Sequence, residues 1–323
     1  MKPPPLVVIV GPTAAGKSAL AIRLAQEFGG EVVACDSTQM YRHFDIGTAK
    51  VPPAEQQGIA HHLADLCEPQ EVFTAGEYRQ RAIAVLADLC ARGKLPILTV
   101  GTGLYLRALL EGLADAPTRS EELRQRLRQR ASERGSPHLH RILAHLDPTA
   151  AARMAPQDEP KLIRAIEVCI LAGKPISEVH RAGRAPLEGW TPVKIGLHPP
   201  RVALYDRINR REVAMLEAGW LDEVRRLVAA GIPATAKPFQ FIGYSVLRAH
   251  LEGKCTLAEA TAAIQQATRR YAKRQLTWFR KEPAVHWLEG FGEDPAALTE
   301  ARRYLREQFP MDRILHTEPG GRV

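Results

Sequence analysis

The sequence predicts an α/β fold, in which helices cover a parallel sheet and an all-helical domain is inserted into the chain. Three observations predict it. A glycine-rich stretch at residues 11–18, GPTAAGKS, stands between a β-branched run and a helical pattern. Strand-like and helical stretches then alternate over the first third of the chain, as in a parallel sheet with crossover helices. From residue 117 to 187 the strand signals vanish, and turns containing Gly or Pro break the helical stretches.

The first strand and helix enclose a phosphate-binding motif. Residues 6–10 (LVVIV) are typical of a strand, and residues 17–28 show helical spacing of apolar positions. Between them, the pattern G-x-x-x-x-G-K-[S/T] directs backbone N–H groups and the positive end of a helix toward an anion. Lys17 is expected to reach the terminal phosphate and the Ser18 hydroxyl to ligate Mg²⁺, so we expect a P-loop NTPase-like fold. The expected diphosphate- or nucleotide-binding residues are Gly11, Pro12, Thr13, Ala14, Ala15, Gly16, Lys17 and Ser18.

The remaining elements follow the same reasoning. Strands are expected at 31–36 and 95–100, and helices at 77–91 and 104–111. A further strand at 193–198 precedes helices at 202–217, 221–230, 244–251 and 257–281. At 323 residues the chain exceeds the usual size of a single core. We expect a first core part at 1–116, the helical insertion at 117–190, a second core part at 191–310 and a tail at 311–323, in which residues 316–323 (HTEPGGRV) are expected to be disordered.

Composition excludes several classes of protein. The apolar share of 45% is that of a globular protein, and no apolar run approaches the length of a membrane span. The five cysteines form no C-x-x-C pair, which argues against a disulfide framework and a structural zinc site. The apolar stretch before Gly11 is too short for a signal peptide. We therefore expect a cytoplasmic protein with no membrane contact.

Basic residues are concentrated in two segments. The net charge is +8, and residues 119–141 hold seven arginines against three glutamates. Residues 269–281 hold six basic residues and no acid, interleaved with Tyr271, Trp278 and Phe279. Such segregation is typical of a surface that binds a polyanion such as a nucleic acid. A solvated helix face explains the first segment nearly as well, but the second has no compensating acid.

Two polar residues stand where chemistry collects in a parallel sheet, at the carboxyl ends of strands. Asp36 ends the run EVVACD, and Thr102 follows the run LPILTV within the turn VGTG. Position alone leaves three interpretations of Asp36 open: a magnesium ligand, a general base or a helix cap. The phosphate motif does not choose among them, since kinases, ATPases and GTPases all carry it.

Five segments together resemble one enzyme family. GPTAAGKS, DSTQMYRHFDIGTAK (residues 36–50), HHLAD (61–65), GTGLYLRALLEGL (101–113) and KRQLTWFR (273–280) occur in the order seen in tRNA dimethylallyltransferases. The resemblance extends from about Val7 to Leu288, and the second and last segments are specific to this family and its close relatives. It implies transfer of a dimethylallyl group from dimethylallyl diphosphate to the exocyclic amine of the adenosine 3′ of the anticodon. The P-loop would then hold the diphosphate of an allylic donor, with Mg²⁺, in a monomer of the bacterial type.

The resemblance also implies roles for individual residues. Asp36 matches the family's general base, and Thr102 matches a residue that contacts the target nucleotide. An arginine of DRINRRE, Arg207 or Arg211, would reach the pyrophosphate, the alternative being a salt-bridged surface arginine. The residues expected to face the tRNA anticodon stem-loop are Asp36, Ser37, Thr38, Gln39, Thr102, Arg124, Lys161, Arg164, Gln240, Gly243, Tyr244, Lys273, Arg274, Gln275 and Arg280.

Two positions depart from the family pattern. Pro160-Lys161 stands where the family often has Gln-Arg, which puts direct anticodon contact there in question. Val100-Gly101 replaces two glycines before Thr102, which narrows the expected turn.

Other functions share parts of the pattern. A small-molecule kinase would share the P-loop, and an adenylate isopentenyltransferase acting on free AMP, ADP or ATP would share Asp36 and Thr102. The basic, aromatic-bearing helix and the helical insertion favour tRNA, because a free nucleotide needs neither. A non-enzymatic RNA-binding module is disfavoured, because Lys17 and Asp36 are expected on neighbouring strand ends.

Overall fold

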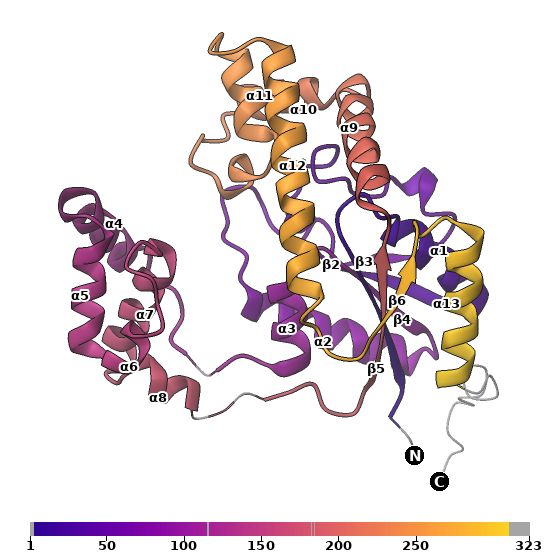
Figure 1. Ribbon diagram of the computed structural model, residues 1–323, viewed down its shortest axis with the longest axis horizontal. Coiled ribbons are helices and arrows are strands. Elements are labelled where there is room, and N and C mark those ends of the chain that lie inside the picture. Colours follow the sequence, from indigo (N-terminus) through magenta and orange to yellow (C-terminus); the bar gives the residue numbers. More distant parts are fainter. Residues whose placement is uncertain (1–2, 115, 182, 184, 310–323) are drawn as a thin grey trace. The chain divides into compact units, whose positions relative to one another are not determined.

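The chain forms two compact units, each with its own core. A computed structural model describes residues 3–114, 116–181, 183 and 185–309 (Figure 1). The first unit comprises Met1–Leu109 with Glu188–Val323, and the second comprises Leu110–Leu187. The predicted tail at 311–323 lies outside the described residues, and the predicted domain boundaries stay a prediction.

The first unit is built on a six-stranded parallel sheet with the strand order β3-β2-β4-β1-β5-β6. The strands are β1 (Pro5–Val10), β2 (Gly30–Cys35), β3 (His61–His62), β4 (Leu95–Val100), β5 (Thr191–His198) and β6 (Val285–Glu289). β1, β2 and β4 are buried along almost their whole length, as expected of central strands covered on both faces. The predicted α/β fold class is thereby confirmed.

Helices cover this sheet and extend beyond its carboxyl edge (Figure 1). They are α1 (Lys17–Phe28), α2 (Ala75–Ala91), α3 (Gly103–Glu111), α9 (Arg201–Glu217), α10 (Trp220–Ala229), α11 (Tyr244–Leu251), α12 (Leu257–Phe279) and α13 (Pro295–Gln308), with 3₁₀ turns at Pro53–Glu55 and Lys237–Gln240. α9 to α12 rise from the end of the sheet where the strands finish, so the loops at that end lie beneath them.

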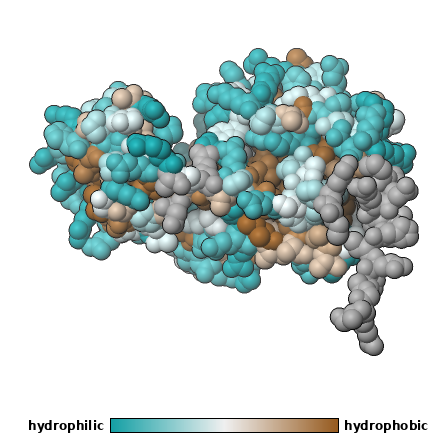
Figure 2. Space-filling model, turned by 90° about the horizontal axis from the view of Figure 1, so that it is seen from below, coloured by the Kyte–Doolittle hydropathy of each residue, from teal (hydrophilic) through white to brown (hydrophobic). Residues whose placement is uncertain are grey.

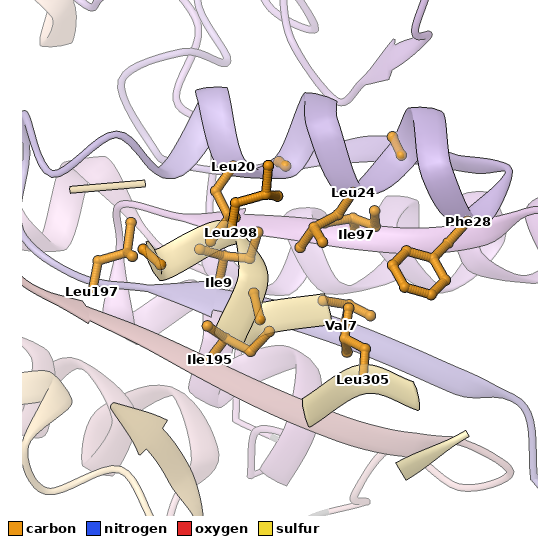
Figure 3. Packing of buried hydrophobic residues seen from close by; sticks show 14 of the residues in the cluster. Val7, Ile9, Leu20, Leu24, Phe28, Ile97, Ile195, Leu197, Leu298 and Leu305 are labelled. Carbon is orange, nitrogen blue, oxygen red and sulfur yellow. The ribbon is translucent and has the colours of Figure 1, made fainter. Parts of the chain in front are cut away.

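The main core lies between the sheet and two helices. Alternate residues of β1, such as Val7 and Ile9, point to the same face and pack with Leu20, Leu24 and Phe28 of α1 (Figure 3). Leu298 and Leu305 of α13 complete the cluster. Packing on α1 and β1 fixes the turn between them, which is the P-loop.

The second unit is all-helical. It contains α4 (Glu121–Arg134), α5 (Ser136–Leu146), α6 (Pro148–Ala151), α7 (Glu159–Ala172) and α8 (Ile176–Arg181). Its own apolar cluster includes Leu139 and Leu143 of α5 and Leu162 and Ile166 of α7, all fully buried.

Several elements differ from the predicted ones. α2 begins at Ala75, earlier than expected, because Thr74 and Glu77 form a reciprocal capping box. α12 ends at Phe279 rather than 281. β3, β6 and α13 are additional to the predicted elements.

Among the described residues no helix is both long and apolar enough to cross a membrane, and the face in Figure 2 is mainly hydrophilic with scattered hydrophobic patches.

Candidate active site

The P-loop, residues 11–18, follows β1 and ends in the first turn of α1. Lys17 lies across the loop and donates from Nζ to the carbonyl oxygens of Gly11 at 3.1 Å and Pro12 at 2.8 Å. Gly16 has φ +86°, and a Cβ there would lie 2.7 Å from the backbone nitrogen of Gly292. Gly292 N–H donates to the Ala15 carbonyl at 2.8 Å, so the loop before α13 supports the P-loop. No side chain caps the N-terminus of α1, and its first turn holds no acid, which leaves its N–H groups suited to an anion.

Positive charge at this loop is only partly balanced. Burial lowers the pKa of Lys17 to about 8, with Asp36 opposing the shift and Arg211 adding to it. Burial likewise lowers the pKa of Arg211. Asp36 faces both cations and Glu212 lies near Arg211, and two partly dehydrated cations at one loop favour the binding of a polyphosphate.

The two candidate arginines of α9 have different partners. Arg211 Nη1 donates to Thr13 Oγ1 of the P-loop at 3.3 Å. Arg207 pairs with Glu293 and lies over the Phe291 ring, 4.7 Å from its centroid. Arg211 is therefore the better placed for the anion, whereas Arg207 is salt-bridged.

The described residues contain no cluster of three or more His, Cys, Asp or Glu side chains able to enclose a metal ion. Mg²⁺, however, often takes only one or two protein ligands together with phosphate oxygens. The Ser18 hydroxyl, in the first turn of α1, is an oxygen donor of the right kind beside the anion cradle. The residues present therefore fit a magnesium ion that would be bound together with the oxygens of a phosphate-containing ligand.

Asp36 follows β2 directly and has one carboxylate oxygen fixed. Oδ1 accepts hydrogen bonds from the Thr38 N–H at 2.9 Å and the Thr38 hydroxyl at 2.8 Å. Oδ2 lies against Gly101, where an added Cβ would come within 1.8 Å of it. Residues 36–40 form a turn and no helix, so the helix-cap interpretation of Asp36 is wrong.

The turn after β4 is joined to the turn after β2. Thr102 Oγ1 accepts from the Ser37 N–H at 2.9 Å and donates to Ser37 Oγ at 3.1 Å. The N–H groups of Gly101 and Thr102 both donate to the Cys35 carbonyl, at 3.1 and 3.0 Å. Val100 is the buried last residue of β4, so the departure from the family pattern lies in the strand and leaves the glycine turn intact.

Strand order corrects one expectation about these turns. β4 lies between β1 and β2, so Lys17 and Asp36 are separated by one strand and are not on neighbouring strand ends. Gly101 and Thr102 occupy the end of that intervening strand. The P-loop, Thr102 and Asp36 thus lie at the ends of three neighbouring strands, β1, β4 and β2.

The basic helix α12 rests on the same turn. Tyr271 OH and Gln275 Nε2 donate to the Gly101 carbonyl at 3.1 and 2.8 Å. A Cβ on Gly103 would lie 2.1 Å from Trp278 Nε1, so that ring packs on the glycine. Three predicted tRNA-facing residues of α12 and its C-terminal end are exposed: Lys273, Arg274 and Arg280.

Several other residues that were predicted to contact tRNA lie in unexpected positions. The Tyr244 side chain is fully buried, and its hydroxyl donates to Glu223 Oε1 at 2.6 Å. Gly243 supports it, with φ +91° and Trp220 packed against its Cα. Gln240 is exposed. Gln39 Nε2 donates to the carbonyls of Thr48 and Ala49 at 3.4 and 3.3 Å. Tyr244 and Gln275 were predicted to face RNA, but both side chains are buried, so any effect of theirs on RNA is indirect.

In the helical unit, the predicted contact residues surround a buried carboxylate. Arg124 donates to both oxygens of Glu167 at 2.8 Å, and Arg164 donates to Oε2 at 2.7 Å. Burial opposes ionisation of Glu167, yet the hydrogen bonds from Arg124, Arg164 and a backbone N–H lower its pKa to about 2. Lys161 pairs with Asp158 at the start of α7. Pro160, the second departure from the family pattern, stands in the first turn of α7, where proline is favoured.

Comparison with known proteins identifies the family. The family model described as IPP transferase matches residues 39–282. The chain is 52% identical over 306 residues to a tRNA dimethylallyltransferase from Koribacter versatilis, covering 95% of this chain and 99% of that one. The chain belongs to the IPP transferase family. The predicted family resemblance is thereby confirmed.

Further relatives agree with this assignment. A tRNA dimethylallyltransferase from Geobacter sulfurreducens is 46% identical over 284 residues, 88% of this chain and 91% of that one. The crystal structure of a tRNA isopentenylpyrophosphate transferase from Bacillus halodurans matches with a TM-score of 0.70 at 37% identity, over 96% and 97% of the two chains. A structure of a eukaryotic dimethylallyltransferase acting on tRNA matches with a TM-score of 0.81 at 26% identity, over 96% of this chain and 80% of that one.

Proposed function

We propose that this IPP transferase transfers a dimethylallyl group from dimethylallyl diphosphate to the exocyclic amine of the adenosine 3′ of the anticodon in tRNA. The observation that carries the proposal is the convergence of the P-loop, Thr102 and Asp36 on three successive strand ends beneath a helix with an exposed basic face. Relatives that share up to 52% of their residues with this chain bear the name of this activity. We further propose that the protein acts in the cytoplasm as a monomer.

The residues supply what the reaction needs. The adenine amine is a weak nucleophile, so a base must accept its proton as the new carbon–nitrogen bond forms. Asp36 offers Oδ2 for this, because Thr38 already holds Oδ1. As the carbon–oxygen bond of the donor breaks, its electron pair leaves with the diphosphate, and Lys17 and Arg211 stabilise that charge. Mg²⁺ held by Ser18 would supply further neutralisation of the diphosphate.

Thr102 and Ser37 fix the position of the base. Their mutual hydrogen bonds tie the turn after β4 to the turn that carries Asp36. An adenine that reaches these strand ends must leave its stack, so the proposal includes extrusion of the base from the anticodon loop.

A transfer assay tests the proposal. Labelled dimethylallyl diphosphate and magnesium are offered with unmodified tRNA, with free AMP or with no acceptor. We expect label on tRNA, lost in Asp36→Asn, with donor binding retained. Label on AMP would instead identify an adenylate isopentenyltransferase, and ATP turnover with no prenyl transfer would identify a kinase.

A further inference from the structure

Gln275 lies on the inner face of α12, in the middle of the most basic segment of the chain. Its side chain is only 6% exposed, whereas Lys273, Arg274 and Thr277 beside it are exposed. A buried polar side chain inside such a segment requires partners, and Gln275 has two that lie far apart in sequence.

Both polar atoms of the Gln275 side-chain amide form hydrogen bonds with turns of the candidate active site. Its Oε1 accepts from the Thr13 N–H of the P-loop at 2.7 Å, and its Nε2 donates to the Gly101 carbonyl at 2.8 Å. A carboxamide can satisfy this pair because it carries a donor and an acceptor. Glutamate lacks the donor, and leucine lacks both.

The two turns that Gln275 bridges are those that the reaction uses. Thr13 is also the P-loop residue that Arg211 contacts, at 3.3 Å. Gly101 carries no side chain, and its Cα lies against the Asp36 carboxylate. Tyr271, one helical turn earlier, donates to the same Gly101 carbonyl at 3.1 Å. Gln275 and Tyr271 thus join α12 directly to the turn that lies against the Asp36 carboxylate, and Gln275 also joins it to the P-loop.

We propose that Gln275 is a positioning residue that couples RNA binding on the exposed face of α12 to the shape of the P-loop. RNA that contacts Lys273 and Arg274 fixes the helix, and the Gln275 amide then holds Thr13 and Gly101 in the arrangement that binds diphosphate. Diphosphate binding strengthens RNA binding by the same factor, since coupling between two sites is reciprocal. The inference rests on the proposed function, because it takes RNA as the partner of the basic face.

The experiment measures the factor by which diphosphate binding strengthens RNA binding. The dissociation constant of an unmodified anticodon stem-loop RNA is determined with and without saturating magnesium and inorganic diphosphate. For the wild type we expect diphosphate to tighten RNA binding by about 5-fold or more, the lower end of usual coupling. In Gln275→Leu the factor is expected to fall to about 1, with the affinity for RNA alone changed much less.

Gln265→Leu is the matched control. Gln265 lies on the same helix and donates from Nε2 to the Asn209 carbonyl at 3.2 Å, away from both turns, so its loss should leave the factor unchanged. An unchanged factor in folded Gln275→Leu, or no coupling in the wild type, would overturn the inference. If Gln275→Leu does not fold, Tyr271→Phe decides: it removes one hydroxyl, and an undiminished factor would count against coupling through this turn.

Failure of the coupling role can be distinguished from failure of the proposed function. Transfer of label to tRNA by the wild type with unaltered coupling in Gln275→Leu rejects the coupling role alone. Absence of RNA binding and of transfer by the wild type rejects both.

Discussion

Gly101→Ala should disable the enzyme by displacing Asp36. The backbone of Gly101 is not in the left-handed region, so alanine is allowed there and only the added methyl group matters. That methyl would lie 1.8 Å from Asp36 Oδ2, whereas ordinary contact begins at 3.4 Å. The carboxylate must therefore retreat by about 1.6 Å, the difference between the two distances.

The magnitude follows from this retreat. Misplacement of a catalytic group by about 1 Å costs roughly 100-fold in rate, which corresponds to about 2.7 kcal/mol. Rotation of the carboxylate also removes its bonds to Thr38, at 2.8 and 2.9 Å. We expect the single-turnover rate of prenyl transfer to fall about 100-fold, with the affinity for donor changed little.

A double-mutant cycle identifies the cause. In Asp36→Ala no carboxylate remains, and the nearest atom left is the Cβ of residue 36, 3.1 Å from the added methyl. Adding Gly101→Ala in that background should therefore cost almost nothing, because both changes act on the same group. An equal loss in the two backgrounds, or full activity of Gly101→Ala with native thermal stability, would refute the assignment of Asp36 as the displaced base.

Three further predictions concern charge and packing. Because the pKa of Lys17 is about 8, its charge is lost as pH rises through that value, and calorimetry should show diphosphate affinity falling there in the wild type relative to Lys17→Met. Gly243→Ala places a Cβ 2.1 Å from Trp220 at φ +91°, and urea unfolding should show it about 2 kcal/mol less stable than Gly231→Ala, which has a similar φ of +75° but open space. The lowered pKa of Glu167 stabilises the folded protein above the ordinary pKa of 4.5, and this stabilisation is lost as pH falls toward about 2. The free energy of unfolding of Glu167→Gln should therefore be about 3 kcal/mol below that of the wild type at neutral pH, and the difference should narrow on acidification.

Local patterns were sufficient for the elements with strong local signals. The helix predicted at 17–28 and the one at 244–251 match α1 and α11, since their apolar spacing and bounding glycines are all in the sequence. β3 is only two residues long, and β6 is a partly buried edge strand, so both depend on pairing that no local signal reveals. α13 did have a readable signal, in the helical spacing of Ala297, Leu298, Ala301 and Leu305.

In the candidate site too, some features were predictable from local sequence and others depend on long-range packing. The P-loop was predictable because its function is local, in a single turn of known geometry. The bond between Thr13 and Gln275 spans 262 positions, and the family resemblance, together with the basic charge of the segment, had placed Gln275 on the RNA-facing side of its helix. Which face of α12 is buried depends on the turns against which it packs, and the basic segment carries no information about them.

The strand order explains how one sheet edge can serve a carbon transfer. Neighbouring strands lie about 4.8 Å apart, so the ends of β1 and β2, with β4 between them, are roughly 10 Å apart. In the proposed reaction the diphosphate lies at the first end and the base at the second, so the reacting carbon and the amine would meet over the β4 turn. A Cβ at Gly101 would collide with the Asp36 carboxylate, and Thr102 and Gln275 each form hydrogen bonds that hold this turn. Glycine at position 101 therefore matters for the proposed reaction as well as for the packing of the turn, because a larger residue would displace the carboxylate that we propose as the base.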